Sequence, residues 1–468
     1  MVNIVIIGAG SASFGPNTIA TLIASPNLHG SRLGLVDRDG AALQRVQAVA
    51  EKMNEAWNAH MDVRASTERR DLLGGADFVI VSIEVSPREK LWRLDWEIPL
   101  RHGLRQPYGE NGGPGGMMHT FRQVPPLLEI ARDMEALCPG AWLINFSNPL
   151  PRLTRAVTRY SGIQTVGKCH QIEMAYAIVA TLLSKQYGLD IPPGLQLHSD
   201  PANVAVKHTV AAQGRQHFRI VAAGLNHFTW MLDVRDRDSG EDLYPALRAA
   251  AEQAPPEFEP LTIDLFRAFN LCPVPGDTHL AEYLPWTHDP QSSPWERYGL
   301  RLYDWEANEL SREVGHHRLA KMASGAVGIN GMRDAVSEGA VEIIEGIVCN
   351  RNSYEEAVNV PNGGAIPNLP PETIVELPAV VSSRGVQPLH IGPLPPGVAE
   401  LCRREAALVE LVVEAAATGD RDLALQALLL DPMINDTDRA RAILDEYLET
   451  FAPYLPQFQP LASRAQRE

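Results

Sequence analysis

The sequence is short of cysteine, and it has no long run of apolar residues. Its 468 residues include five cysteines, which are scattered without paired spacing. Unpaired thiols are typical of a reducing compartment, so we expect a cytoplasmic protein. The N-terminal stretch MVNIVIIGAG has no basic flank and no cleavage site, so it predicts a strand and not a signal peptide. No apolar run is long enough to cross a bilayer, and we therefore expect no membrane partner.

Positive charge is also scarce. The 41 Lys and Arg residues against 57 Asp and Glu residues give a net charge of −16. Because nucleic-acid binding depends on clustered Lys and Arg, this balance argues against a nucleic-acid partner. It does not exclude a small-molecule ligand in a pocket. With 45% hydrophobic residues, the chain has enough apolar material for a core and enough length for two or three domains.

The first half of the chain alternates short apolar runs with helical stretches. The runs are almost uniformly apolar, as expected of parallel strands that are covered on both faces. The predicted strands are NIVIIGAG (3–10), RLGLVD (32–37), ADFVIVSI (76–83), AWLINFSN (141–148) and QTVGKC (164–169). Helices are predicted between them, at 17–24 and 40–57. This alternation predicts an α/β fold with a Rossmann-like, doubly wound parallel sheet at the N-terminus.

The second half is less regular. An acidic, Pro-containing stretch lies near 251–275, a Pro- and Gly-rich passage lies at 359–397, and helices follow to about residue 450. We place the domain boundary near residue 195, where IPPGLQL interrupts the pattern. The predicted domains are a Rossmann-like domain at 1–195 and a mixed α+β domain at 196–468.

The motif GAGSAS (8–13) directly follows the first predicted strand. Gly8 permits a tight turn, and Gly10 lets the backbone approach a pyrophosphate that the next helix N-terminus attracts. The fingerprint is incomplete because Ser13 replaces its third glycine. Asp37 ends the second strand where a carboxylate can bind the ribose hydroxyls, which favours NAD over NADP. The alternative is that Asp37 caps the following helix. The candidate cofactor contacts are Gly8, Gly10, Ser11, Ser13, Asp37 and Ser82.

Polar residues follow the later predicted strands. Ligands bind at the carboxyl ends of the strands in open α/β sheets, where Asn148 and the pair Cys169–His170 are expected. A lone cysteine is often only a small buried side chain, and adjacent strand residues point to opposite faces. A thiolate and an imidazole together would suit a divalent metal. Spacing alone leaves open whether the partner is His227 in GLNHFTW or one of four residues in GDTHLAEY, namely Asp277, His279, Glu282 and Tyr283.

Taken together, these segments resemble glycoside hydrolase family 4. The resemblance is carried by GAGSAS, YGENGGPGGMMHTFRQVP (108–125), FSNP (146–149), KCHQ (168–171), GLNHFTW (224–230), GDTHLAEY (276–283) and NGGAIPNLPPETIVELPA (362–379). It spans essentially the whole chain in the right order, and the GLNHF and GPGG segments are more specific than the glycine fingerprint. This NAD-dependent family departs from the two-carboxylate mechanism of most glycosidases.

The resemblance implies an oxidative route with NAD and a divalent metal, expected to be Mn²⁺, as cofactors. NAD⁺ accepts a hydride from C3 of the sugar, and the metal polarises the resulting carbonyl and acidifies the C2 proton. A base removes that proton, and the aglycone leaves C1. By motif match, Cys169 and His227 are the metal ligands, while Asn148 and Glu110 contact substrate hydroxyls.

The remaining catalytic roles are assigned by the same resemblance. His170 is an acid or a substrate contact beside the metal cysteine. The C2 base is Asp277 or Tyr283, and Asp277 is preferred because a carboxylate needs less adjustment of its pKa to accept a proton near neutrality. His279 is a third candidate for the base or a substrate contact.

Departures from the family pattern bear on the substrate. The phosphosugar branch has Asn or Asp after the metal cysteine, where this chain has His170, and an Arg where this chain has Trp92. We therefore expect an unphosphorylated, α-linked glycoside, which is a hexoside, a uronide or a sulfosugar. Arg122, Arg105 and His119 lie in segments that would meet an anionic C6 group, or equally they are surface or cofactor contacts.

Two other classes of protein share parts of this pattern. An ordinary NAD-dependent dehydrogenase of the malate or sugar-acid type would have the same first domain, but the GLNHF and GDTHLAEY motifs argue against it. A catalytically silent NAD-binding regulator would have no use for the pair Cys169 and His227. The family resemblance also implies a homodimer or a homotetramer that acts on a small-molecule glycoside.

Overall fold

The N-terminal strands form the parallel sheet that the sequence predicts. The structure is a computed structural model of residues 1–468, and it describes all of them except 12–13, 193, 198–200, 289–293, 336 and 460–468. The strands in spatial order are β3 (Asp62–Ser66), β2 (Arg32–Val36), β1 (Asn3–Ile7), β4 (Phe78–Val81), β5 (Trp142–Asn145) and β6 (Gln164–Gly167). All of their pairings are parallel. This is the strand order of a Rossmann fold, so the predicted fold is confirmed.

Helices cover both faces of this sheet, which explains its uniformly apolar strands. Alternate side chains of β1 enter two separate cores, with Ile4 and Ile6 in one and Val5 and Ile7 in the other. The first core includes residues of α1 (Phe14–Ala24) and α2 (Gly40–Ala56), and the second includes residues of α5 (Gly113–Leu137) and α6 (Leu150–Tyr160). A strand that is buried on both faces has no polar positions to give it an alternating pattern.

The second half of the chain extends the same sheet with antiparallel strands. These are β10 (Ser353–Pro361), β11 (Ile374–Ser382), β7 (Phe218–Leu225), β8 (Phe228–Asp236) and β9 (Cys272–Pro273), with β12 (Gly385–Pro388) paired to β11. Asn359 of β10 pairs with Gly167 of β6, and this pairing joins the two halves. The predicted boundary at residue 195 stays a prediction, because the sheet continues from one half of the chain into the other.

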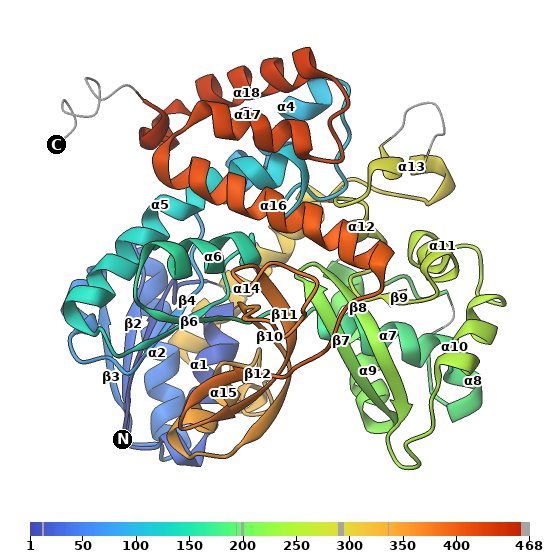
Figure 1. Ribbon diagram of the computed structural model, residues 1–468. Helices are drawn as coiled ribbons and strands as arrows, with labels where there is room; N and C mark the ends of the chain where they lie inside the picture. Colours follow the sequence, from blue (N-terminus) through green and yellow to red (C-terminus); the bar gives the residue numbers. More distant parts are fainter. Residues whose placement is uncertain (12–13, 193, 198–200, 289–293, 336, 460–468) are drawn as a thin grey trace.

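Three C-terminal helices return to the first half. Figure 1 shows α16 (Pro396–Thr418), α17 (Arg421–Leu430) and α18 (Thr437–Thr450) stacked over α5 and α4 (Arg88–Arg101). The Tyr447 hydroxyl donates to the Asp95 carbonyl at 2.5 Å, and Arg155 Nε lies 2.5 Å from Glu410 Oε1. The far end of the chain therefore helps to fix the helices that border the N-terminal sheet.

The other helical segments connect these elements. Those of α type are α3 (Arg70–Leu73), α7 (Ile172–Leu182), α8 (Ser184–Tyr187), α9 (Pro201–His217), α10 (Tyr244–Ala251), α11 (Pro260–Phe269), α12 (Asp277–Leu280), α13 (Pro294–Arg297), α14 (Trp305–Ser324) and α15 (Ala340–Val348). Short 3-10 helices are Pro26–Leu28, Pro285–Thr287, Asn330–Met332, Ala452–Tyr454 and Pro456–Phe458. Of the helices in the described ranges, none is both long and apolar enough to span a membrane.

Candidate active site

The turn after β1 has the close backbone approach that a dinucleotide site requires. Gly8 has φ +92°, and a Cβ atom there would lie 1.9 Å from the Ser82 carbonyl oxygen. The Gly10 amide donates to Asp37 Oδ2 at 2.8 Å, and a Cβ on Gly10 would lie 2.7 Å from the same oxygen. Glycine is therefore required at position 8, and a side chain at position 10 would displace the Asp37 carboxylate. Gly8, Gly10, Asp37 and Ser82 thus lie together at the carboxyl ends of neighbouring strands.

Helix α2 is capped by a residue other than Asp37. Asp39 Oδ1 accepts from the amides of Ala41 and Ala42, at 2.9 and 3.0 Å. The alternative that Asp37 caps the helix is therefore wrong, and Asp37 remains a candidate for the ribose contact. The Ser11 amide donates to the Gly8 carbonyl at 3.4 Å, so it belongs to the same turn. Ser13 lies outside the described residues.

Glu110 and Asn148 lie together beside this turn. Strand β5 ends at Asn145, three residues before Asn148, and the Asn148 side-chain amide donates to Glu110 Oε2 at 3.2 Å. His119 supports the Glu110 backbone, because its Nδ1 lies 3.0 Å from the Glu110 carbonyl oxygen. Its Nε2 lies 3.0 Å from the carboxylate of Glu84, and this carboxylate raises the pKa of His119 against the effect of burial. Carboxylate and amide groups thus converge on one point, as hydroxyl contacts would require.

Cys169 and His227 meet across the two halves of the chain. Cys169 follows β6, His227 lies between β7 and β8, and their Sγ and Nε2 atoms are 3.3 Å apart. His227 Nδ1 is buried and has no partner among the described residues. Burial raises the pKa of the Cys169 thiol to about 12 and lowers the pKa of His227. A metal would therefore have to displace the thiol proton.

The pair fits a divalent metal by the chemistry of its donors. A soft thiolate and a borderline imidazole suit a transition metal, and Cys169 Sγ and His227 Nε2 face each other at 3.3 Å. In the described ranges, no group of three or more His, Cys, Asp or Glu residues is placed to hold a metal. Two protein ligands leave positions for water or for substrate oxygens.

The loop that carries His227 is fixed by a buried glutamate that the sequence analysis missed. The Asn226 side-chain amide donates to Gln171 Oε1 at 2.9 Å and to Glu376 Oε2 at 2.8 Å. Asn359 also donates to Glu376 Oε2, and burial raises the pKa of Glu376 to about 7. Glu376 lies in the segment 362–379. Its IVELPA stretch places a carboxylate inside an apolar strand, and this feature could have indicated Glu376 from the sequence.

His279 and an aromatic cluster extend from the metal pair. The rings of His227 and His279 stack with centroids 4.5 Å apart and planes 11° apart. Tyr108 meets the edge of His279 at 4.9 Å. Trp92 is buried against Tyr108, Tyr303 and Trp305, with ring centroids 5.2, 4.5 and 5.0 Å away. A largely aromatic wall, with most of its rings packed edge to face, therefore begins at the metal pair.

The carboxyl group of Asp277 is bound to the start of α11. Its carboxyl group accepts from the Leu261 amide at 3.0 Å and from the Thr262 amide and hydroxyl at 2.8 and 2.7 Å. Burial and the neighbouring Glu259 carboxyl raise the pKa of Asp277 well above its usual range. Both oxygens thus hold the first turn of α11, which gives Asp277 a role in the fold, and its role as the base stays a prediction.

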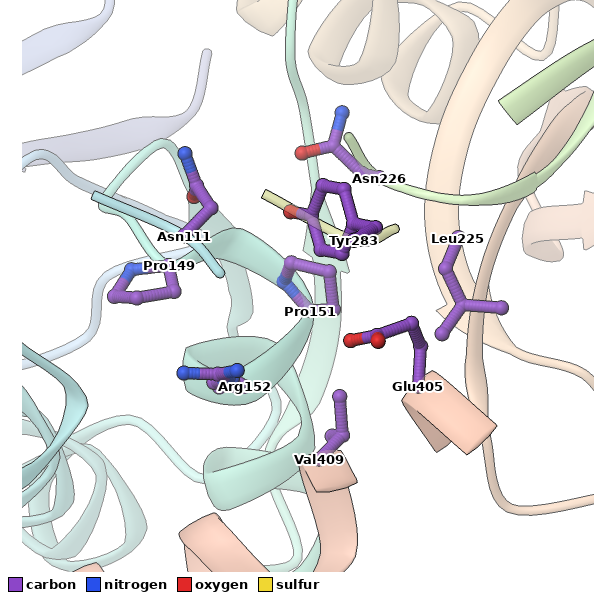
Figure 2. A pocket seen from close by; sticks show the side chains of 9 residues that line it. All are labelled: Asn111, Pro149, Pro151, Arg152, Leu225, Asn226, Tyr283, Glu405 and Val409. Carbon is purple, nitrogen blue, oxygen red and sulfur yellow. The ribbon is translucent and has the colours of Figure 1, made fainter. Parts of the chain in front are cut away.

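Tyr283 lines a small cavity with residues from both halves of the chain. The cavity has a volume of about 10 Å³, and Figure 2 shows the residues around it: Asn111, Pro149, Pro151, Arg152, Leu225, Asn226, Tyr283, Glu405 and Val409. Burial raises the pKa of the Tyr283 phenol, whereas the Arg152 guanidinium lowers it. Since Asn226 precedes His227, the tyrosine is next to the metal pair.

His170 and Arg122 differ from each other in exposure and in surroundings. His170 is half exposed, and its Nδ1 lies 3.9 Å from Glu338 Oε2.

Arg122 is buried within α5, where its two terminal nitrogens both bind the carboxylate of Asp95. The fold thus uses both terminal nitrogens of the Arg122 guanidinium, and the prediction of Arg122 as a substrate contact stays a prediction. Arg105 lies over the Trp295 ring at 4.9 Å, as a surface contact would.

Comparison with known proteins agrees with this geometry. The family model described as family 4 glycosyl hydrolase matches residues 3–185, and the model of the C-terminal domain of that family matches residues 222–434. An α-glucosidase of Erwinia rhapontici is 32% identical, and the match covers 97% of this chain and 98% of the relative. An α-galactosidase of Bacillus subtilis is 28% identical, over 98% of this chain and 100% of the relative.

Solved structures show the same architecture. A glucosidase structure from Bacillus subtilis aligns with a TM-score of 0.81 and 27% identity, over 96% of this chain and 100% of that chain. A 6-phospho-α-glucosidase from gut microorganisms, solved with NAD and Mn²⁺, has the same fold, with a TM-score of 0.77 and 22% identity over 98% of this chain and 100% of that one. The fold and the matches therefore define a Rossmann-like glycoside hydrolase. The chain belongs to family 4 of the glycosyl hydrolases, so the predicted family is confirmed.

Proposed function

We propose that the protein is an NAD- and divalent-metal-dependent glycosidase that cleaves an unphosphorylated, α-linked glycoside through transient oxidation at C3 and elimination at C1. The observation that carries this proposal is the pair Cys169 and His227, whose Sγ and Nε2 atoms are 3.3 Å apart. A thiol and an imidazole from separate halves of the chain, beside a dinucleotide turn, have no use in a two-carboxylate glycosidase.

The residues present suit both cofactors. Gly8, Gly10 and Asp37 would hold NAD, with Ser11 and Ser82 as further contacts, and Cys169 and His227 would hold a divalent metal, which we expect to be Mn²⁺. When bound, NAD⁺ would accept a hydride from C3, and the metal would polarise the resulting carbonyl so that the C2 proton becomes acidic. Glu110 and Asn148 would orient the sugar by hydrogen bonds to its hydroxyl groups.

The structure changes our preference for the base. Asp277 was preferred from the sequence, but both of its oxygens accept hydrogen bonds from the start of α11. We therefore assign the removal of the C2 proton to Tyr283, which lies in the cavity wall next to Asn226. Burial raises the pKa of its phenol, so the positive charge of the bound metal and of NAD⁺ would have to offset that effect. His170, half exposed beside the metal cysteine, would contact the substrate, since burial lowers its pKa to about 4 and leaves the ring neutral. His279, stacked on His227, is retained as a substrate contact.

The surroundings of Trp92 support an unphosphorylated substrate. Tyr108, Tyr303 and Trp305 pack around Trp92. The Arg88 guanidinium lies over the Trp92 ring at 4.7 Å, but it is already paired with the carboxylates of Glu84 and Glu110, which leaves little positive charge to compensate a phosphate. Relatives of this chain are named α-glucosidase, α-galactosidase and α-galacturonidase, so a neutral hexoside and a uronide both remain candidates. A sulfosugar is the third candidate. The substrate is a small molecule, and a cytoplasmic location and a homodimer or homotetramer stay predictions.

Hydrolysis of aryl α-glycosides in D₂O tests the proposal. Activity should require NAD⁺, Mn²⁺ and a reducing agent, and the product should carry deuterium at C2 because the base removes the C2 proton in each turnover. Unphosphorylated substrates, including uronides and sulfoquinovosides, should be preferred over 6-phosphates. Cys169→Ser should lose metal binding and activity but keep NAD binding, and the exposed Cys349→Ser is the matched control. Product without C2 label, together with full activity of Cys169→Ser, would refute the proposal, and stoichiometric NADH release without metal would indicate a dehydrogenase.

A further inference from the structure

His279 and Glu282 form a buried pair of side chains next to the metal pair. His279 Nδ1 lies 3.3 Å from Glu282 Oε2, and the two side chains are 15% and 1% exposed. The Glu282 amide donates to the His279 carbonyl at 3.0 Å, so the turn of α12 continues and places both side chains on one face. From spacing alone Glu282 was a possible partner of Cys169, but His227 occupies that position.

The His279 ring is fixed by contacts on several sides. One face stacks on His227 with ring centroids 4.5 Å apart, and Tyr108 packs against His279 edge to face at 4.9 Å. Nδ1 faces Glu282, whereas Nε2 has no hydrogen-bond partner in the described part of the chain and is not fully buried. Nε2 is therefore the polar atom of this ring that a ligand can reach.

The fold alone gives no reason to bury Glu282. Its second oxygen, Oε1, is buried and has no hydrogen-bond partner among the residues that the structure describes. Burial raises the pKa of Glu282, the His279 ring lowers it, and the Glu110 carboxylate raises it again. A Cβ atom on Gly112 would lie 2.7 Å from Glu282 Cβ, so the loop that carries Glu110 closes directly over this residue. A pair that only stabilised the turn would cost less on the surface, where water solvates the carboxylate.

The partner of Nδ1 decides what Nε2 can bind. A neutral histidine whose Nδ1 donates to a carboxylate carries its proton on that nitrogen, so its Nε2 presents a lone pair. We propose that Glu282 is a positioning residue that holds His279 in this Nδ1–H form, and that His279 Nε2 accepts a hydrogen bond from a sugar hydroxyl. The inference rests on the proposed function, in which His279 contacts the substrate, and it adds the direction of that hydrogen bond and the residue that sets it.

Nitrogen NMR of the full-length protein tests the proton position. The protein is labelled in its histidines and measured before Mn²⁺ is added, because this paramagnetic ion broadens nearby signals. The His279 signals, identified by their loss in His279→Phe, should show a protonated Nδ1 and an unprotonated Nε2. Glu282→Leu should move the proton to Nε2, whereas Glu282→Gln, whose carbonyl oxygen can still accept from Nδ1, should keep the wild-type form. A wild-type proton on Nε2, or an unchanged form in Glu282→Leu, would overturn the proposal.

A double-mutant cycle tests the link to the substrate. With an aryl α-glycoside that the wild type cleaves, Glu282→Leu should lower kcat/KM by about tenfold, the value of one hydrogen bond, and Glu282→Gln should restore most of it. Adding Glu282→Leu to His279→Phe should cause no further loss, because Glu282 acts through His279. A tenfold further loss in the double variant would show that Glu282 serves only the fold, and it would overturn the positioning role.

A second glutamate–histidine pair provides the matched control. Glu446 Oε2 lies 2.7 Å from His102 Nε2, where α18 meets the end of α4. Glu446→Leu should change the His102 signals, keep those of His279, and leave kcat/KM at the wild-type value. Failure of the wild type to cleave any glycoside would refute the proposed function, whereas the NMR spectra alone decide the proton position on His279.

Discussion

Asp277 provides the sharpest test of how the structure revises the site. Replacement by alanine removes an acceptor from three buried donors, which are the amides of Leu261 and Thr262 and the Thr262 hydroxyl. Leu261 and Thr262 are both fully buried, so water cannot replace the lost carboxyl group. If Asp277 is structural, the change should appear in the free energy of unfolding and only weakly in the chemistry.

The expected magnitude follows from the three hydrogen bonds. A buried donor left without a partner costs about 1–3 kcal/mol, so Asp277→Ala should lower the free energy of unfolding by about 3 kcal/mol or more. Asp277→Asn keeps one carbonyl oxygen for Thr262 but presents an amide group to Leu261, and it should cost about 1–2 kcal/mol. Asp39→Ala, which removes the exposed cap of α2, is the matched control, with an expected loss of about 1 kcal/mol.

The assay pairs urea unfolding with initial rates at a temperature where each variant is folded. The structural role predicts rates within about tenfold of the wild type, since the carboxyl group takes no part in proton transfer. Loss of a general base would instead lower kcat about a hundredfold to ten-thousandfold. A fall of that size in Asp277→Asn, with the free energy of unfolding within about 0.5 kcal/mol of the wild type, would refute the assignment and restore Asp277 as the base.

Two further predictions concern the cofactor site and the core. Asp37→Ala should weaken NAD binding by about 1.5–3 kcal/mol, the value of lost charged hydrogen bonds, in a fluorescence titration, and an unchanged affinity would show that Asp37 only holds the Gly10 turn. Burial and the nearby Asp431 raise the pKa of Glu405 from 4.5 to about 8, so the folded protein keeps a proton that the unfolded chain releases, and the free energy of unfolding should fall as pH rises through that window. Glu405→Gln should reduce the slope of the free energy of unfolding against pH, measured by urea unfolding, by about 1.4 kcal/mol per pH unit between the two pKa values. An unchanged slope would contradict the raised pKa.

The parallel half of the fold could be predicted from the sequence because its signals are local. Strands such as Phe78–Val81 are buried on both faces and therefore consist of uninterrupted apolar residues. The edge strand Asp62–Ser66 was missed, because its exposed and half-buried residues, DVRAS, carry no apolar run. The antiparallel extension was not predicted either, since its link to β6 depends on the pairing of Asn359 with Gly167, which come from distant parts of the chain.

The same distinction between local and tertiary signals applies to the site. Gly8, Asn148 and Cys169 follow strands of the parallel sheet, so their convergence follows from topology alone. A charged side chain such as Arg122 or Asp277 can equally serve the fold, and the choice depends on partners that only the tertiary structure brings near. Asp95, one helix away, binds both terminal nitrogens of Arg122. A polar residue type therefore indicates a functional site at the end of a strand, but it does not do so inside a helix.

The pairing of Cys169 with His227 depends on the whole sheet. Cys169 lies at the end of the parallel half, whereas His227 lies in the β7–β8 turn, and the path between them runs through β10 and β11. Glu376 of β11 holds Asn226, so a strand from the distant Pro- and Gly-rich segment sets the position of the histidine. Spacing along the chain cannot encode this arrangement. A site built in this way needs both halves of the chain to be assembled before its thiol and imidazole can meet.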